Sequence, residues 1–304
     1  MEKHSGLIAA PFAPLHSDGS INPEIIESYY HFLERNGISG VFINGTTGEG
    51  ASLTQKERQH ITSAWTACSG IKKSLRIINL VGGTSYNECI ENAIHSRESG
   101  VSAIAVIAPY FFKPADENHL ADFVARIGVA VPDMPVYFYH IPVITGVSIP
   151  MVGFLKKISG MLPNFAGIKY THEDFMDYLS CLDFNDGKYD LFWGRDECML
   201  SAMAIGARAF VGSTYNYAAP LYHELIRSFK NGDLSSAKKY QQKSVNMISL
   251  NSKYGGIATG KAFMRYVGID CGNYRSPVKN LTDEMYREFI KDVKALQMDN
   301  LFSK

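Results

Sequence analysis

The stretch Phe165-Ala166-Gly167-Ile168-Lys169-Tyr170-Thr171 places a lysine at the end of a short apolar run. Burying a charged ammonium costs free energy, so a lysine in this position requires an explanation. Loss of solvation lowers the pKa of a lysine, and a partly neutral amine can attack a carbonyl to form a Schiff base. A lysine that extends its ammonium back to water, or pairs with a carboxylate, is the alternative interpretation. The residues that the fold brings beside Lys169 decide between the two.

On both sides of this stretch the chain repeats a short apolar run followed by a helical or polar segment. Such apolar runs, without polar alternation, are typical of parallel strands covered on both faces. About eight strand–helix units predict a closed (β/α)8 barrel. An open doubly wound sheet is the alternative fold, but no GxGxxG follows the first strand. The candidate strands cover 6–10, 40–44, 76–81, 101–108, 135–140, 165–170, 189–193 and 208–212.

Beyond the eighth candidate strand the pattern is helical throughout. The candidate helices cover 220–231, 234–253, 260–267 and 282–298. We expect residues 1–215 to hold the barrel strands and their connecting helices. Residues 216–304 should then hold the last barrel helix and a C-terminal helical extension of the same domain, because no low-complexity linker separates a second one.

The composition favours a protein that acts on a small molecule. Of the 304 residues 46% are hydrophobic, and Lys plus Arg balance Asp plus Glu at 30 each, which argues against nucleic acid or a membrane surface as a partner. Five scattered cysteines, none in a CxxC pair, fit a reducing cytoplasm better than a disulfide framework or a thiolate zinc site. The N-terminus lacks the apolar core of a signal peptide, and no run approaches the ~20 apolar residues that span a bilayer.

Polar residues follow several of the candidate strands. In a barrel of this kind the active site lies at the C-terminal ends of the strands. After the second strand, Gly45-Thr46-Thr47-Gly48 offers hydroxyls and backbone N–H groups that suit a carboxylate, although an ordinary turn fits as well. Tyr139, near the end of the fifth strand, offers a phenol for general acid–base chemistry. Its neighbour His140 has no second ligand at metal spacing, so we expect no metal site.

Two further strand ends present hydrogen-bonding groups. After the seventh strand, Gly194-Arg195-Asp196-Glu197 puts two carboxylates at a helix start, where they either bind sugar hydroxyls or complement the helix dipole. After the eighth strand, Gly212-Ser213-Thr214-Tyr215-Asn216 offers the hydroxyl and amide groups that a polar, uncharged ligand needs. Because parallel strands end at the same rim, these segments predict one polar site around Lys169.

Three segments, in this order along the chain, carry a resemblance to a known family. Gly45 to Glu49, Tyr139 to Gly146, and Gly167-Ile168-Lys169 resemble the pyruvate-dependent class I aldolases typified by dihydrodipicolinate synthase and N-acetylneuraminate lyase. The likeness extends over almost the entire chain. Within the family, the segments 44–50, 139–142 and 212–217 most resemble the branch that acts on sialic acid.

The resemblance implies reversible retro-aldol cleavage of sialic acid to pyruvate and N-acetylmannosamine. Lys169 would form a Schiff base with the C2 carbonyl of the keto acid, and Thr46 and Thr47 would hold its carboxylate. Tyr139 would move the proton of the C4 hydroxyl, so no metal or coenzyme would be required. The remaining substrate-binding residues that the resemblance implies are Thr171, Gly194, Asp196, Glu197 and Ser213.

A homotetramer is also implied by the resemblance. Many members of the family carry tyrosine where this chain has Phe111, in a loop that crosses to a neighbouring subunit and supports the catalytic tyrosine. Phe111 cannot donate a hydrogen bond, whereas the adjacent Tyr110 offers a phenol. We therefore leave this loop outside the catalytic set.

Three alternative functions stay open at this point. The first is another 2-keto-3-deoxy sugar acid aldolase that uses the same imine chemistry. The second is a dihydrodipicolinate synthase-like enzyme, which Asp196 and Glu197 disfavour because they would repel the second carboxylate of a dicarboxylic product. The third is a non-catalytic keto-acid-binding protein, although a binder needs neither the nucleophile Lys169 nor the phenol of Tyr139.

Overall fold

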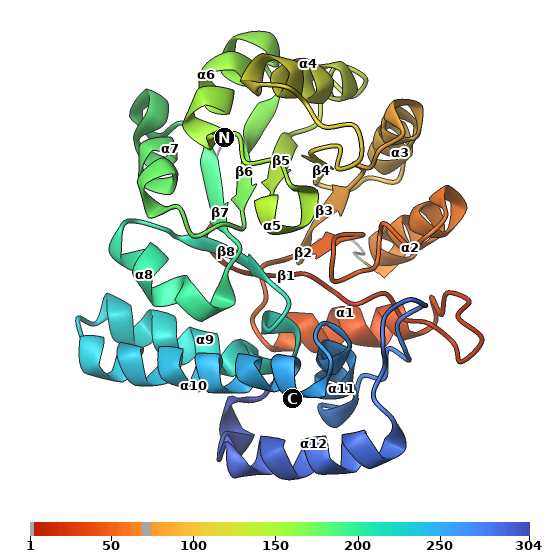
Figure 1. Cartoon of the computed structure of the whole chain (residues 1–304), viewed down its shortest axis with the longest axis vertical. Helices are drawn as coiled ribbons and strands as arrows, with labels where there is room; N and C mark the ends of the chain where they lie inside the picture. The colour runs from red at the N-terminus through yellow and green to blue at the C-terminus, as the bar shows by residue number, and fades with distance from the viewer. Residues whose placement is uncertain (1–2, 69–73) are drawn as a thin grey trace.

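The computed structural model describes residues 3–68 and 74–304, and within them eight parallel strands form a closed barrel (Figure 1). Neighbouring strands pair in chain order, and β8 closes the barrel by pairing with β1. The predicted (β/α)8 barrel with C-terminal helices is therefore confirmed. The strands are β1 (Gly6–Ala9), β2 (Gly40–Ile43), β3 (Arg76–Leu80), β4 (Ala103–Ile107), β5 (Val136–His140), β6 (Phe165–Tyr170), β7 (Asp190–Trp193) and β8 (Ala209–Gly212).

Helices surround the barrel and leave the C-terminal ends of the strands free for a site. Thr54 begins the second helix with a capping box, because its N–H donates to Glu57 Oε2 at 2.8 Å and the Glu57 N–H returns a bond to Thr54 Oγ1. The connecting helices are α1 (Ile25–Arg35), α2 (Gln55–Cys68), α3 (Tyr86–Glu98), α4 (Glu117–Gly128), α5 (Pro142–Thr145), α6 (Met151–Met161), α7 (Phe175–Gly187), the 3-10 helix η1 (Asp196–Cys198) and α8 (Met199–Ala204).

The hydrophobic core has two parts because each strand buries both of its faces. One cluster, which includes Phe42, Tyr137 and Phe192, fills the barrel interior. The larger cluster, with Trp65 and Phe154 among its members, lies between the barrel and the helices. The barrel is thus a packed scaffold, and its rim is the place for polar chemistry.

After β8 the chain is helical, as the sequence predicts. The C-terminal helices are α9 (Tyr215–Lys230), α10 (Leu234–Tyr254), α11 (Ala258–Tyr266), α12 (Asp283–Ala295) and the 3-10 helix η2 (Asp299–Leu301). In Figure 1 α9 and α10 lie side by side, and α12 lies farthest from the barrel. No helix in the described ranges is long and apolar enough to cross a membrane.

One predicted helix boundary is wrong. The candidate helix over 220–231 was predicted to begin at Pro220, but α9 begins five residues earlier, at Tyr215. Ala218 has a non-helical φ of −137°, so the helix is kinked just before the proline. Tyr215 and Asn216 consequently belong to the first turn of α9, and both are fully buried.

Candidate active site

The turn after β2 is held in shape from inside the protein. Asn44 adopts the left-handed conformation, with φ of 56°, and its amide donates to Asn79 Oδ1 at 2.8 Å and Thr62 Oγ1 at 3.1 Å. A Cβ atom on Gly50 would overlap the carbonyl of Asn44, so only glycine fits there. This fixed backbone presents Thr46 at the rim of the barrel, where its hydroxyl lies 3.4 Å from that of Tyr139.

Lys169 and Tyr139 are direct neighbours on adjacent strands. Their Cα atoms pair across β5 and β6, and both side chains are buried. The Lys169 Nζ lies 3.9 Å from the ring centroid of Tyr139 and 4.0 Å from that of Phe42. The amine is therefore enclosed by aromatic faces at the base of the site, with 4% of the lysine exposed.

Burial lowers the pKa of Lys169 from its ordinary value of 10.5 to about 7, although the Asp196 carboxylate acts in the opposite direction. The two aromatic faces also favour the ammonium, but desolvation is the stronger effect here. A large fraction of the amine is neutral at neutral pH as a result. Lys169 thus has the protonation state that a nucleophile for a carbonyl carbon needs.

The phenol of Tyr139 stays protonated at neutral pH. Burial raises its pKa above 10, while the hydrogen bond with Thr46 acts in the opposite direction. A protonated phenol both donates and accepts, so it can pass a proton between a substrate hydroxyl and a neighbouring acceptor. The Tyr139 ring is in direct contact with the Lys169 amine.

Asp196 has one satisfied oxygen and one unsatisfied oxygen. Its Oδ2 accepts hydrogen bonds from the Thr214 hydroxyl at 2.5 Å and the Thr214 N–H at 3.2 Å. Its Oδ1 is also buried and has no partner at good hydrogen-bond geometry among the described residues, although the nearby Tyr215 hydroxyl acts on the carboxyl as a donor that lowers its pKa. Burial raises the pKa of Asp196 to about 6, so the carboxyl is mostly ionised at pH 7. The residue lines the cavity, so its negative charge favours a ligand that presents hydroxyl donors.

Two glycines make room for these side chains. A Cβ atom on Gly194 would overlap the hydroxyl of Thr171, and a Cβ atom on Gly212 would overlap Asp196 Oδ1. Glycine at both positions therefore lets the ends of β6, β7 and β8 approach one another. Gly194 contributes backbone surface to the site rather than a side chain.

Arg195 organises the acidic side of the site. Its guanidinium pairs with Glu173 and, at 3.0 Å, with Glu197. Arg195 belongs to the predicted motif after the seventh strand, but no role is predicted for it. A pairing with Glu173 from the preceding loop is a tertiary contact that residue spacing does not reveal.

The nine residues predicted for the site surround one cavity of about 250 Å³. Their placement together is observed, whereas their individual roles stay predictions. The nine are Thr46, Thr47, Tyr139, Lys169, Thr171, Gly194, Asp196, Glu197 and Ser213. The same cavity is also lined by residues that were not predicted for the site, among them Arg195 and, from the C-terminal helices and their connection, Ile248, Asn251 and Ile257.

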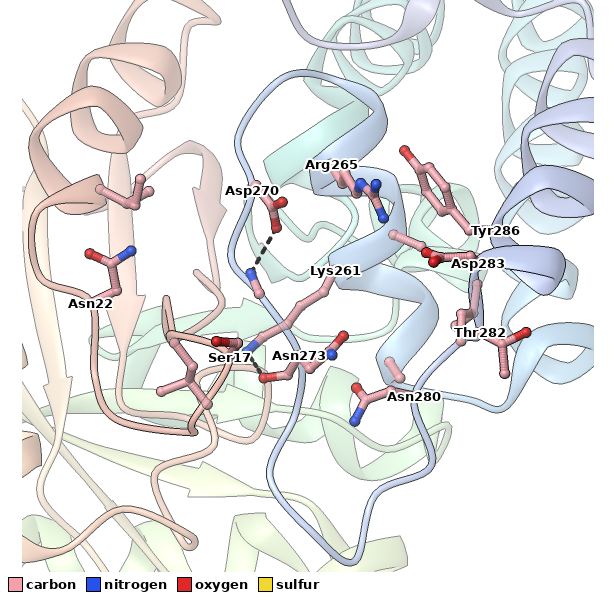
Figure 2. A pocket seen from close by; sticks show the side chains of 16 residues that line it. Ser17, Asn22, Lys261, Arg265, Asp270, Asn273, Asn280, Thr282, Asp283 and Tyr286 are labelled. Carbon is pink, nitrogen blue, oxygen red and sulfur yellow. Dashed lines mark hydrogen bonds between the residues drawn. The ribbon is translucent and has the colours of Figure 1, made fainter.

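A larger cavity, of about 490 Å³, lies between the segment 15–25 and the C-terminal helices α11 and α12 (Figure 2). It contains none of the nine predicted residues. Lys261 lines it, and Figure 2 shows the side chain extending from α11 to the backbone of Asn273. The Lys261 Nζ also donates to Glu49 Oε1 at 2.7 Å. Lys261 thereby connects the C-terminal extension to the turn that carries Thr46.

His140 is buried between Tyr170 and His172, with ring centroids at 5.0 and 5.7 Å. Burial is the main cause that lowers its pKa to about 3. Within residues 3–68 and 74–304, no three His, Cys, Asp or Glu side chains gather as a metal ion would require. The geometry around His140 is that of a neutral, packed ring.

Comparisons with known proteins agree with this arrangement. N-acetylneuraminate lyase from Gallus gallus is 39% identical over 97% of this chain and 95% of its own length. N-acetylneuraminate lyase from Rattus norvegicus is 37% identical over 97% of this chain and 93% of its own. Among solved structures, Proteus mirabilis N-acetylneuraminate lyase superposes with a TM-score of 0.94 at 37% identity, covering 97% of this chain and 99% of its own.

The sequence model of the dihydrodipicolinate synthetase family matches residues 3–296. That range includes all eight barrel strands and the helices up to α12. The resemblance noted from three motifs is therefore confirmed, and the chain belongs to the dihydrodipicolinate synthetase family.

Proposed function

We propose that this protein is a class I aldolase that reversibly cleaves N-acetylneuraminate, a sialic acid, to pyruvate and N-acetylmannosamine. The observation that carries the proposal is a buried lysine with a pKa of about 7, in contact with a phenol and facing a cavity lined by hydroxyls and carboxylates. The names and high coverage of the relatives at 37–39% identity support the same substrate.

In the proposed reaction the neutral amine of Lys169 attacks C2 of the open-chain keto acid, and water leaves to give an iminium ion. Thr46 and Thr47 bind the carboxylate at the glycine-rich turn. Tyr139 accepts the proton of the C4 hydroxyl while its own phenolic proton passes to the substrate carboxylate bound at the turn, and as the C3–C4 bond breaks the bonding electrons pass into the iminium to form an enamine. Protonation at C3 and hydrolysis then release pyruvate. The iminium is the electron sink, so this scheme uses no metal or coenzyme.

The other end of the cavity suits a polyhydroxylated chain. The Asp196 carboxylate favours a hydroxyl donor, and Glu197, Ser213 and the backbone of Gly194 offer further polar contacts. Thr171 directly follows β6, two residues after Lys169, and lines the same cavity. Two carboxylates favour hydroxyl donors and repel a second substrate carboxylate, which disfavours a dihydrodipicolinate synthase reaction.

The deciding experiment measures pyruvate release from N-acetylneuraminate by the wild type and by Lys169→Ala. We expect release by the wild type alone, and borohydride reduction with pyruvate should trap an adduct on Lys169. An unmodified Lys169 would contradict the Schiff-base mechanism. Faster turnover of 2-keto-3-deoxygluconate than of sialic acid would instead favour another sugar acid aldolase. A wild type that binds sialic acid but does not cleave it would favour a binding protein.

The assembly that we propose is a homotetramer, with the loop around Phe111 at a subunit contact. In the single chain Phe111 is 74% exposed and Phe112 is 85% exposed. Val143 and Ile144 are 76% and 55% exposed. Exposed apolar side chains of this number, on a loop and on the short helix α5, are typical of a protein interface. Light scattering tests the proposal, and a monomeric mass would contradict it.

We also propose that the protein works in the cytoplasm. All five cysteines are free in the structure, and three of them are buried, as expected where thiols stay reduced. Cell fractionation tests this location. Recovery of the protein from a secretory compartment would contradict it.

A further inference from the structure

A series of hydroxyl groups leads from Asp196 into the C-terminal helices. Thr214, the residue before α9, donates its hydroxyl proton to Asp196 Oδ2 at 2.5 Å. The Thr214 hydroxyl oxygen lies 2.7 Å from the hydroxyl of Tyr222 on α9. That hydroxyl lies 2.7 Å from the hydroxyl of Ser244 on α10, and all four side chains are buried. We call Thr214, Tyr222 and Ser244 the hydroxyl chain.

While Asp196 is ionised, the hydroxyl chain can run in one direction only. A carboxylate only accepts hydrogen bonds, so the Thr214 hydroxyl gives its one proton to Asp196 and must accept from Tyr222. The Tyr222 hydroxyl then accepts from Ser244 in turn. Burial raises the pKa of Tyr222 well above 10, which keeps its phenol a donor. Three consecutive hydroxyls therefore donate toward the carboxylate, and each bond in such a series strengthens the next.

Asp196 needs this support because burial opposes its charge. Burial raises the pKa of Asp196 to about 6, and the Thr214 hydroxyl is the strongest of the effects that lower it. The Asp196 carboxylate in turn raises the pKa of Lys169. Its titratable or charged neighbours belong to its own segment, to the barrel and to α9, whereas α10 contributes the uncharged Gln241, which donates to the Asp196 backbone oxygen at 3.1 Å. These neighbours are Arg195 and Glu197, then Tyr139 and Lys169, then Tyr215, Tyr217 and Tyr222.

We propose that the hydroxyl chain positions Asp196 and keeps its carboxylate ionised, so that the charge acts on the Lys169 amine and on hydroxyl donors in the cavity. Thr214, Tyr222 and Ser244 are positioning residues, because they act through Asp196 and not on the reacting atoms. Tyr222 and Ser244 do not line the cavity, so α9 and α10 contribute to the site from behind it. The inference rests on the proposed function, since it concerns the same lysine imine.

The first measurement is pyruvate trapping on Lys169 as a function of pH in the wild type and in Thr214→Val. The valine keeps the side-chain size but removes the hydroxyl, which should raise the pKa of Asp196 by about one pH unit or more. At pH 6 the carboxyl is then mostly protonated, so Lys169 loses the charge that favours its ammonium. The midpoint of trapping should fall by about half a pH unit, which makes trapping at pH 6 about threefold faster than in the wild type.

Cleavage of sialic acid should change in the opposite direction. In Thr214→Val the KM should rise about threefold at pH 6, because fewer molecules carry the charge that favours hydroxyl donors. At pH 8.5 it should approach the wild-type value, because the carboxyl is ionised in both proteins. Tyr222→Phe removes the donor behind Thr214 and should give both effects at a smaller size. A general packing defect would slow trapping and weaken substrate binding together.

Three further variants complete the experiment. Thr214→Ser keeps the hydroxyl and should restore the wild-type midpoint and KM. Asp196→Asn has no charge at any pH, so it should lower the midpoint at least as far as Thr214→Val. Tyr266→Phe is the matched control, because the Tyr266 phenol lies 3.4 Å from a different carboxylate, that of Asp299, and its loss should change neither value.

The inference is overturned if Thr214→Val and Tyr222→Phe keep the wild-type midpoint, or if both trap pyruvate more slowly at pH 6. Tyr222→Phe alone decides if Thr214→Val does not fold. A wild type that forms no adduct with pyruvate contradicts the proposed function itself, and the inference fails with it. A wild type that forms the adduct, with variants that do not shift its midpoint, contradicts the inference alone.

Discussion

At the scale of single residues, burial sets the chemistry of Lys169. Because its pKa is about 7, the rate of reductive trapping with pyruvate should rise over about one pH unit on either side of that value. The measurement follows adduct mass against pH with cyanoborohydride, and a simple primary amine corrects for the reagent. A midpoint near 10, the ordinary value for lysine, would show that the amine is not desolvated.

Tyr139 has a separate task, and a variant can isolate it. Tyr139→Phe keeps the ring that contacts the Lys169 amine but removes the hydroxyl. We expect cleavage of sialic acid to fall about 10²- to 10⁴-fold, the usual contribution of a general acid–base group, while pyruvate trapping continues. Steady-state kinetics and adduct mass together test this. Loss of the adduct would mean that the phenol acts in imine formation instead.

His140 should make stability depend on pH. Its pKa is about 3 in the folded state against 6.5 as an ordinary value, so below pH 6.5 the unfolded state binds more protons. Stability therefore falls as the pH falls from 6.5 toward 3. By pH 5 the loss from this group is about 2 kcal/mol. The glutamine in His140→Gln cannot be protonated. Between pH 7 and pH 5 the free energy of unfolding of this variant, measured with denaturant, should therefore fall by about 2 kcal/mol less than that of the wild type. Parallel curves for both proteins would contradict the assignment.

At the scale of elements, the C-terminal extension holds the carboxylate turn in place. The Lys261 ammonium pairs with Glu49, and the hydroxyl of Tyr274 donates to the backbone oxygen of Thr47 at 3.0 Å. Glu49 also has φ of 56° and accepts the N–H of Arg275 at 3.1 Å. These bonds connect α11 and the segment after it to the residues that present Thr46 and Thr47.

Breaking this ion pair should affect both stability and substrate binding. Lys261→Met leaves the buried Glu49 without its cation, which typically costs about 3–5 kcal/mol. We expect a higher KM for sialic acid with a smaller change in kcat, because the turn binds the carboxylate but does not react.

The double variant Glu49→Gln with Lys261→Met is the control. It removes both buried charges, so it should recover much of the stability that Lys261→Met loses. Denaturant unfolding and steady-state kinetics on the wild type, Lys261→Met and the double variant measure how far the effects of the two substitutions depend on each other. An unchanged KM in a folded Lys261→Met protein would show that the Lys261–Glu49 pair stabilises the fold without affecting substrate binding.

Elements differed in how well the sequence predicts them. Apolar runs predicted all eight strands, because residues covered on both faces cannot alternate with polar ones. The predicted start of α9 was five residues late, because the helix is kinked at Ala218 and Pro220 lies inside it rather than at its beginning. Asn251 and Lys261 were not predicted as neighbours of the site. Lys261 meets Glu49 across 212 positions, a contact that local periodicity does not contain.

At the scale of the whole molecule, a closed barrel explains why residues far apart in sequence form one site. Parallel strands end at a common rim, so Thr46, Tyr139 and Lys169 meet once the fold is known. The sequence was therefore sufficient for the barrel and for the gathering of the nine residues. It was insufficient for the wall that α10 adds, since the docking of helices beyond the barrel depends on tertiary packing.

Two exposed phenylalanines predict where the subunits of the protein contact one another. Phe111 and Phe112 pack edge to face at 5.0 Å and are largely exposed, which is costly for a monomer in water. Phe112→Glu should place a charge in the proposed contact and lower the mass measured by light scattering, while circular dichroism stays that of the folded barrel. Glu98→Ala, at the solvent-exposed end of α3, is a surface control that should keep the wild-type mass. If Phe112→Glu assembles like the wild type, the subunit contact does not include this loop.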